Sequence, residues 1–340
     1  MTTQTPPRQA EQPAANASPE AIMRVASGFM SAKHLFVANE LGLFEALADS
    51  PATIDALADR VGLTRRAARI SADAMVALGM LEREGDIYRN SPAAATFLAG
   101  RTPADLRPLL RFWDKISYLN WARFAETLGT GSAPDVLKLS AELQEVLSAG
   151  IAAVLAGPAA ALAQTVDFGA SHRLLDVGGG TGSWSIAAAK AHPHLDATVL
   201  ELPAVVDIAR ANVAAAGLTA RIDVITGDAM AEPLPAGYDV FLLANLIHYW
   251  TPDGNRALLR GVRDAAAPGS RLLLADFWTN PTHTEPLHAA LMAGEFAVHT
   301  PDGDVYSVDE MRGWLSETGW RFIEHVPLAG PQSLIVAEAA

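Results

Sequence analysis

Apolar residues recur every three or four positions between residues 21 and 50, which is the period of an α-helix. They include Ile22, Phe29 and Leu43, and they are too many for a lone surface helix. We therefore expect this segment to pack against another apolar surface, such as that of a second copy of the chain. Residues 1–19 before it are polar, lack the apolar core of a signal peptide, and are expected to form a disordered tail.

The next forty residues predict two short helices followed by a hairpin. Thr53 is placed to cap a helix that ends near Gly62, and Thr64 is placed to cap a second helix that stops at Gly79. Residues 80–89 then alternate around a Gly-Asp turn, as the two strands of a hairpin do. Helix, turn, helix and hairpin together are the layout of a winged helix.

A winged helix can bind DNA through its second helix, and here that helix carries Arg65, Arg66 and Arg69. The chain as a whole, however, has 25 basic and 38 acidic side chains, a net charge of −13. An acidic surface repels the phosphates of nucleic acids. We therefore favour a mainly helical, winged-helix-like dimerisation domain at residues 20–105 with no nucleic-acid partner. A DNA-binding regulator is the alternative.

The sequence contains no cysteine, which excludes disulfides, iron–sulfur clusters, thiolate zinc sites and a cysteine nucleophile. This is compatible with the reducing cytoplasm, where we expect the protein to work. Residues 148–166 carry no charge and are long enough to span a membrane. Because the stretch is mostly alanine and includes Gly150, Gly157 and Pro158, we expect a buried helix of a soluble protein without a membrane partner.

Residues 106–168 are expected to form a helical linker that contributes to a substrate pocket. Aromatic side chains concentrate in its first third: Phe112, Trp113, Tyr118, Trp121 and Phe124. Such a group either belongs to a core or walls a pocket for a flat aromatic ligand, and the sequence leaves both open.

From residue 169 onward, short apolar runs alternate with helical patterns. Strands are expected at 173–177, 198–200, 222–225, 238–244, 271–275, 321–326 and 332–338, and helices at 184–192, 203–215, 253–266 and 307–318. This alternation predicts an α/β domain at residues 169–340 with a Rossmann-like, seven-stranded and mostly parallel sheet covered on both faces.

A glycine-rich turn follows the first of these strands and carries Gly178, Gly180 and Gly182. Such a turn lets a ligand approach the backbone at a helix N-terminus. A dinucleotide-binding turn would place its third glycine at Ser183, and Asp176 beside the turn would repel a pyrophosphate. The carboxylate would instead attract a cation, so nicotinamide chemistry is disfavoured.

Acidic residues end the next two strands. Glu201 is placed to accept hydrogen bonds from both hydroxyls of a ribose. Asp228 is placed to accept from an exocyclic amine, while Ala229 and Met230 pack on an adenine face. With a cation site at Asp176, these features predict a sulfonium nucleoside, S-adenosylmethionine, as the cofactor.

Four motifs in order carry a family resemblance: Asp-Val-Gly-Gly-Gly-Thr-Gly at 176–182, Glu-Leu-Pro at 201–203, Gly-Asp-Ala-Met at 227–230 and Leu-Ile-His-Tyr-Trp at 246–250. The chain resembles the class I O-methyltransferases of the caffeate and hydroxyindole type over residues 20–338. The resemblance implies a homodimer, S-adenosylmethionine as cofactor with Leu202 and Asn245 among its contacts, and methylation of a hydroxyl on a small aromatic or polyketide-like metabolite. It assigns His248 as the general base, which an imidazole suits chemically.

The chain departs from the family pattern around this base. The family usually has an aspartate directly after the histidine, where this chain has Tyr249. The first glutamate that flanks the histidine in the family is replaced by the shorter Asp276, which we expect to hold the imidazole ring. The second flanking acid is replaced by Val305, so that neighbouring Asp304 is the candidate substitute. These departures keep a cofactor-binding homologue that transfers no methyl group as an alternative.

His299 suggests another alternative. Its spacing from His248 resembles that of related enzymes, which methylate a carbon of 2-oxo acids and hold a metal with two histidines. His248 and His299, assisted by Asp276 or Glu295, would provide ligands for iron or zinc. We favour a site without a metal, in which Met292, Phe296 and His299 line the acceptor pocket with Phe112, Trp113 and Trp121.

Overall fold

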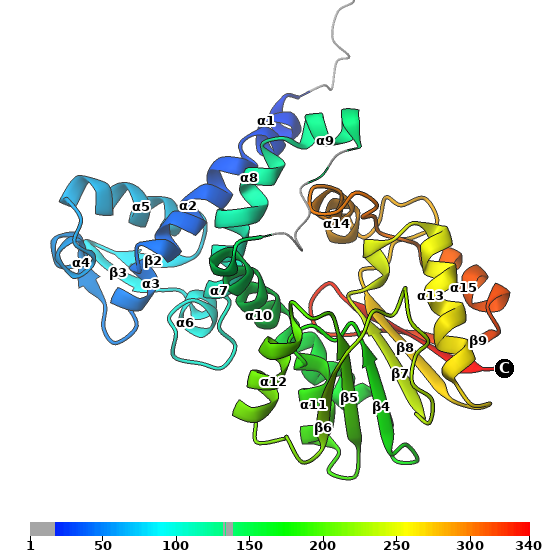
Figure 1. Ribbon diagram of the computed structural model, residues 1–340. Helices are drawn as coiled ribbons and strands as arrows, with labels where there is room; N and C mark the ends of the chain where they lie inside the picture. Colours follow the sequence, from blue (N-terminus) through cyan, green and yellow to red (C-terminus); the bar gives the residue numbers. More distant parts are fainter. Residues whose placement is uncertain (1–17, 132, 134–138) are drawn as a thin grey trace, which may run out of the picture. The chain divides into compact units, whose positions relative to one another are not determined.

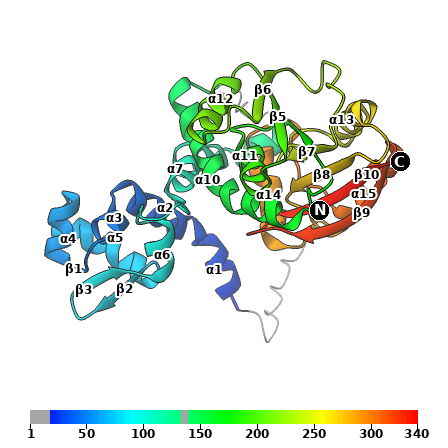
Figure 2. The ribbon, with the colours of Figure 1, turned by 90° about the horizontal axis from the view of Figure 1, so that it is seen from below.

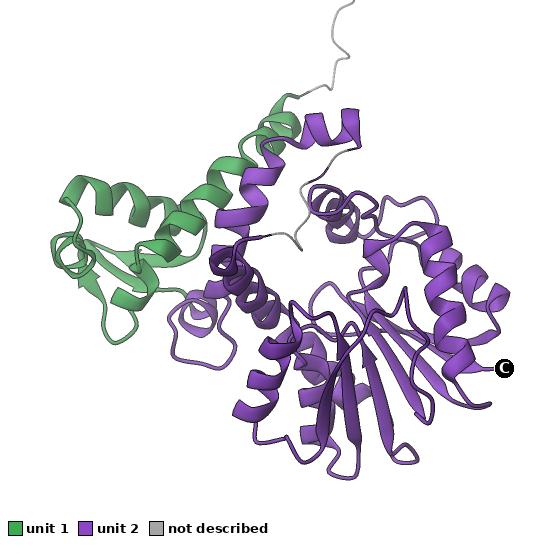
Figure 3. Ribbon diagram, in the orientation of Figure 1, with its two compact units in different colours: residues 1–91 green, residues 92–340 purple. Residues whose placement is uncertain are grey.

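The computed structural model describes residues 18–131, 133 and 139–340. The expected disordered tail thus lies almost wholly outside the described residues. Contacts between Cα atoms divide the chain into two compact units, residues 1–91 and residues 92–340 (Figure 3). The domain boundaries expected near residues 105 and 168 stay predictions, and each unit is described by itself.

The first unit has the predicted winged-helix layout. Its elements are α1 (Glu20–Ala26), α2 (Gly28–Glu40), α3 (Leu43–Ala46), β1 (Ala52–Thr53), α4 (Ile54–Val61), α5 (Arg65–Ala77), β2 (Leu81–Glu84) and β3 (Ile87–Asn90). The side chains of Thr53 and Thr64 cap α4 and α5, and Gly62 ends α4 at a φ of +66°. The hairpin β2–β3 and the short β1 form a three-stranded antiparallel sheet.

Apolar side chains remain exposed on α1 and α2 of this unit. They are Ile22, Met23, Val25, Phe29 and Met30, each more than half exposed. Two of the three arginines of α5, by contrast, are paired with acids, Arg65 with Asp55 and Arg69 with Asp73. The described residues of the unit therefore offer an apolar surface for a partner, whereas most of the positive charge of α5 is neutralised.

The second unit is built on a seven-stranded sheet in the order β6-β5-β4-β7-β8-β10-β9 (Figures 1 and 2). Its strands are β4 (Arg173–Val177), β5 (Asp196–Glu201), β6 (Ile222–Thr226), β7 (Val240–Ala244), β8 (Arg271–Asp276), β9 (Trp320–Pro327) and β10 (Ser333–Ala339). Strands β4 to β8 are parallel, and β10 runs antiparallel between β8 and β9. The carboxyl ends of the parallel strands therefore meet at one edge, where ligands of such sheets bind.

Helices cover both faces of this sheet. Its helical elements are α6 (Pro92–Phe97), α7 (Arg107–Phe112), η1 (Trp113–Ser117), α8 (Tyr118–Trp121), α9 (Phe124–Thr130), α10 (Ala141–Thr165), α11 (Ser183–Ala191), α12 (Val206–Ala215), η3 (Ile247–Tyr249), α13 (Pro252–Ala265), α14 (Leu287–Ala297) and α15 (Val308–Glu317). Alternate residues of the strands pack on α10, α11 and α12 on one face and on α13 and α15 on the other. The two-faced, mostly parallel sheet confirms the predicted fold class.

The uncharged stretch identified in the sequence lies inside α10. By length and hydropathy alone this helix could cross a membrane. Leu155, Ala159 and Leu162 on its inner side are instead buried in the core against the sheet and α11. This packing favours the expected core helix over a membrane span.

Candidate active site

The glycine-rich turn connects β4 to α11 at the carboxyl edge of the sheet. Gly178, Gly180 and Gly182 have φ values of +63°, +57° and +77°, which side chains disfavour. A Cβ on Gly179 would lie 2.7 Å from the carboxyl carbon of Asp176, so this position also has no room for a side chain. The turn thus folds its backbone tightly over Asp176.

Asp176 is fully buried beneath the turn. Ser185 donates a hydrogen bond of 2.7 Å to its Oδ2, whereas its Oδ1 has no partner among the described residues. Burial raises the pKa of Asp176 to about 7, and the charge of Glu201 adds to the increase. A buried oxygen beneath the glycine-rich turn that lacks a hydrogen-bond partner is typical of a binding site in which a polar or cationic ligand provides that partner.

Glu201 ends β5 next to the turn, as predicted. Its Oε1 accepts a 3.1 Å hydrogen bond from the backbone N–H of Gly180, and its Oε2 accepts one from Leu202. Burial raises the pKa of Glu201, although these two backbone donors oppose the increase. The carboxylate is therefore held in a fixed orientation, and its remaining lone pairs suit the hydroxyls of a ribose.

The other predicted cofactor residues follow β6 and β7 at the same edge. Asp228 Oδ1 accepts a 2.8 Å hydrogen bond from the N–H of Met230, which shapes the turn around Ala229. Asn245 follows β7 with a φ of +53°, a rare value for a residue with a side chain, and its buried Oδ1 is unpaired among the described residues. Backbone strain and an unpaired oxygen at one residue indicate a binding role.

His248 lies on η3, three residues after Asn245, and pairs with Asp276 at the end of β8. The distance from His248 Nδ1 to Asp276 Oδ1 is 2.9 Å, and both side chains are almost completely buried. A carboxylate accepts only, so Nδ1 carries the proton that it donates. Nε2 is then the ring atom left to accept a proton, as a general base requires.

Neighbouring residues fix the short η3 turn. Asn255 donates hydrogen bonds to the carbonyls of Ile247 and Trp250 on either side of His248. Asp304 contributes through its backbone, since its N–H donates to the carbonyl of His248. Its side chain is exposed and accepts from the N–H of Val305, so this geometry does not favour the expectation that the carboxylate replaces the second flanking acid.

Tyr249 brings a neutral phenol to the position next to the base. Its ring centroid lies 4.7 Å from that of His248. Desolvation raises the pKa of Tyr249 to about 12, and the charges of Glu201 and Asp276 contribute to the increase. The phenol therefore keeps its proton at neutral pH and adds no charge to the site.

The predicted acceptor-pocket residues come from two segments that the fold brings together. Phe112 and Trp113 pack in a small cluster with Ile116, while Met292 and Phe296 pack in another with Phe277. Phe296 also stacks on His248, with ring centroids 3.6 Å apart and planes at 5°. We call Phe112, Trp113 and Phe296 the aromatic wall, and through Phe296 this wall contacts the ring of the base.

His299 and Trp121, two further residues predicted for the pocket, belong to a group of hydrogen-bonded side chains around Glu295. His299 Nε2 donates to Glu295 Oε1 over 2.9 Å, and Asn120 Nδ2 lies 3.1 Å from His299 Nδ1. Trp121 Nε1 and Ser117 Oγ also donate to Glu295. Sequence reasoning named Glu295 only as an auxiliary metal ligand and missed Ser117 and Asn120, which no motif marks.

This geometry does not favour the alternative with two histidines on one metal. Both ring nitrogens of His299 have partners, and one nitrogen of His248 is bound to Asp276. Among the described residues, no group of three or more histidine, aspartate or glutamate side chains is arranged to hold a metal ion.

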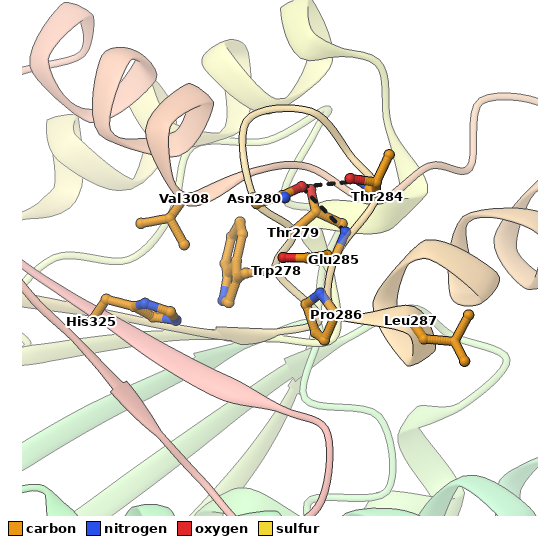
Figure 4. A pocket seen from close by; sticks show the side chains of 9 residues that line it. All are labelled: Trp278, Thr279, Asn280, Thr284, Glu285, Pro286, Leu287, Val308 and His325. Atoms are coloured by element: carbon orange, nitrogen blue, oxygen red, sulfur yellow. Dashed lines mark hydrogen bonds between the residues drawn. The ribbon is translucent and has the colours of Figure 1, made fainter.

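An open depression lies elsewhere on the unit, where β8 runs into the loop before α14 (Figure 4). It is lined by Trp278, Thr279, Asn280, Thr284, Glu285, Pro286, Leu287, Val308 and His325. None of these residues belongs to the predicted site, so the depression is separate from the chemistry described above.

Comparison with known families decides the identity of the two units. Residues 114–321 match the O-methyltransferase domain, and residues 23–100 match the O-methyltransferase dimerisation domain. The chain belongs to the O-methyltransferase family. As a member of this family it is an S-adenosylmethionine-dependent methyltransferase.

Individual members of the O-methyltransferase family align with nearly the whole chain. The 3-hydroxy-5-methyl-1-naphthoate 3-O-methyltransferase of Streptomyces sahachiroi is 33% identical and covers 92% of this chain and 92% of its own length. The tetracenomycin polyketide synthesis 8-O-methyl transferase of Streptomyces glaucescens is 30% identical, with 94% and 96% covered. The solved structure of PigF with SAH is 26% identical, has a TM-score of 0.83, and covers 95% and 100%.

The described residues fit this cofactor. The unpaired oxygens of Asp176 and Asn245, the oriented carboxylate of Glu201 and the tight glycine turn converge on one sheet edge. Such donors and acceptors suit the amino-acid part and the ribose of S-adenosylmethionine.

Proposed function

We propose that this methyltransferase methylates a hydroxyl of a flat, small aromatic or polyketide-like metabolite, with His248 as general base. The hydrogen-bonded pair of His248 and Asp276 at the sheet edge carries the proposal. The aromatic residues Phe112, Trp113 and Phe296 favour a flat acceptor. Two relatives whose names specify a naphthoate and a tetracenomycin polyketide support the same class of acceptor.

Bound S-adenosylmethionine would supply the electrophilic methyl carbon and, once its carbon–sulfur bond breaks, leave as S-adenosylhomocysteine. The acceptor oxygen takes the methyl group, and its proton passes to His248 Nε2. Asp276 holds Nδ1–H of the same ring and stabilises the positive charge that develops there. Glu201 and Asp228, after the ends of β5 and β6, would hold the nucleoside, and much of the rate would come from this fixed orientation.

The test is His248→Ala, assayed with 3-hydroxy-1-naphthoate and a panel of polycyclic phenols. Mass spectrometry detects the replacement of one hydrogen by a methyl group. We expect transfer to fall by about a hundredfold or more, while calorimetry shows wild-type affinity for S-adenosylhomocysteine. Near-wild-type turnover by the variant would exclude His248 as the base.

We also propose that the protein works in the cytoplasm and that residues 106–168 form part of its acceptor pocket. We further propose that it is a homodimer. The match to a dimerisation domain and the exposed apolar side chains of α1 and α2, such as Val25 and Phe29, support the dimer. Light scattering should give twice the chain mass. A monomer at micromolar concentration would contradict the proposal.

A further inference from the structure

A buried carboxylate behind the aromatic wall has no part in the proposed transfer step. Glu295 has an 11% exposed side chain and accepts hydrogen bonds from Ser117 Oγ at 2.7 Å, Trp121 Nε1 at 2.5 Å and His299 Nε2 at 2.9 Å. Burial opposes its charge, but the hydrogen bonds, that from His299 foremost, hold the pKa of Glu295 below its ordinary value. The group is therefore an anion at neutral pH, held by three side-chain donors.

The histidine in this group is fixed as well. Nε2 of His299 donates to Glu295, and Nδ1 accepts from Asn120 Nδ2, because an amide nitrogen can only donate. Both ring nitrogens are occupied within the protein. His299 therefore supports Glu295 and is not available as a second base.

These hydrogen bonds are a main attachment of α14. Only Ala289 and Glu295 of its eleven residues are buried, whereas Leu287 and Leu291 on the same helix are 72% and 58% exposed. Gly294 allows a close approach at this attachment, since a Cβ there would lie 2.5 Å from Trp121 Cη2. The bonds of Glu295 to η1 and α8 thus hold the helix together with the apolar packing of Met292 and Phe296 on Phe277.

The next residue along α14 contacts the base. Phe296 lies parallel to the imidazole of His248 at 3.6 Å, while Asp276 holds the edge of the same imidazole. The orientation of His248 therefore depends on where α14 places Phe296. Glu295 sets that place through residues more than 170 positions earlier in the chain.

We infer that Glu295 is a positioning residue for methyl transfer, which anchors α14 so that Phe296 clamps the ring of His248. Glu295 touches no reacting atom in this role. The inference rests on the proposed function only in treating His248 as the base. The stacking of Phe296 on His248 is present in the protein without an acceptor.

The experiment compares Glu295→Gln with the wild type, each labelled with ¹³C in histidine and loaded with S-adenosylhomocysteine. A carboxamide offers one acceptor oxygen in place of two, so at least one donor loses its partner. In the wild type the ring current of Phe296 shields the ring protons of His248, and Phe296→Leu identifies that signal. We expect Glu295→Gln to move it downfield, toward its position in Phe296→Leu.

Leu287→Ala is the matched control, because this exposed residue lies on the same helix, and it should leave the signal in place. We also expect Glu295→Gln to lower kcat by about tenfold with an unchanged KM for S-adenosylmethionine. If Glu295→Gln does not fold, Ser117→Ala removes a single donor and should give a smaller shift in the same direction. An unshifted His248 signal in a folded variant would overturn the inference, whether or not an acceptor is known.

Discussion

Replacing Asp276 by asparagine tests the charge behind the base while nearly preserving its shape. Asp276 Oδ1 lies 2.9 Å from His248 Nδ1 and 2.8 Å from the N–H of Phe277. Asparagine keeps one oxygen that can accept these bonds but removes the negative charge. Both side chains of the pair are at most 6% exposed, so water screens their interaction weakly.

The loss can be estimated from this distance. Two unit charges 2.9 Å apart interact by about 6 kcal/mol at an effective dielectric constant of about 20. If roughly half of the proton charge has reached the imidazole in the transition state, about 3 kcal/mol of stabilisation is lost. Since each 1.36 kcal/mol is tenfold in rate, we expect Asp276→Asn to lower kcat by about a hundredfold.

The assay measures methyl transfer at saturating S-adenosylmethionine, with binding of S-adenosylhomocysteine measured separately by calorimetry. Asp304→Asn is the matched control, because that carboxylate is exposed and accepts its hydrogen bond from the N–H of Val305, and it should keep wild-type kcat. If Asp276→Asn turned over within twofold of the wild type, the charge of Asp276 would have no part in the reaction.

Two further predictions concern the cofactor turn. The fold raises the pKa of Asp176 from 3.8 to about 7. Between about pH 4 and pH 7 Asp176 therefore ionises in the unfolded chain but stays protonated in the folded protein, and the free energy of unfolding falls as the pH rises. In the cofactor-free protein, urea unfolding of Asp176→Asn should therefore show a gain over the wild type that grows across this window to at most about 4 kcal/mol; a gain independent of pH would refute the assignment. Gly179→Ala would place its Cβ 2.7 Å from the Asp176 carboxyl carbon and should lower the free energy of unfolding by about 1–3 kcal/mol and weaken S-adenosylhomocysteine binding. Gly261→Ala, where nothing lies within 4 Å, is its control and should raise the free energy of unfolding, and equal effects of both would disprove the steric argument.

Local chemistry explains why the fold was predictable. Thr53 and Thr64 begin helices because their hydroxyls accept from free backbone N–H groups, and Gly62 ends one because it tolerates a positive φ. Strand β7 was predicted because all five of its residues are apolar, as burial on both faces requires. Each of these signals depends on neighbouring residues alone, so the sequence displays them directly.

The site was predictable only where motifs mark it. The acids of β4, β5 and β8 come after apolar residues at or next to the carboxyl end of each strand, and the parallel sheet brings these ends together. Two of the three side chains that donate to Glu295 lie in a different segment, with Ser117 178 and Trp121 174 positions away. Neither spacing nor composition relates two segments whose packing depends on the whole unit, so these two contacts had no signal in the sequence.

The position of β10 has a consequence for the folding order. This strand comes after β9 in the chain, yet it lies between β8 and β9 and pairs with both. A nascent chain that has reached residue 332 therefore exposes the unpaired edge of β8, and β9 has nothing to pair with. Such an edge invites pairing with other chains. Premature termination in this region should therefore yield aggregates rather than a trimmed enzyme.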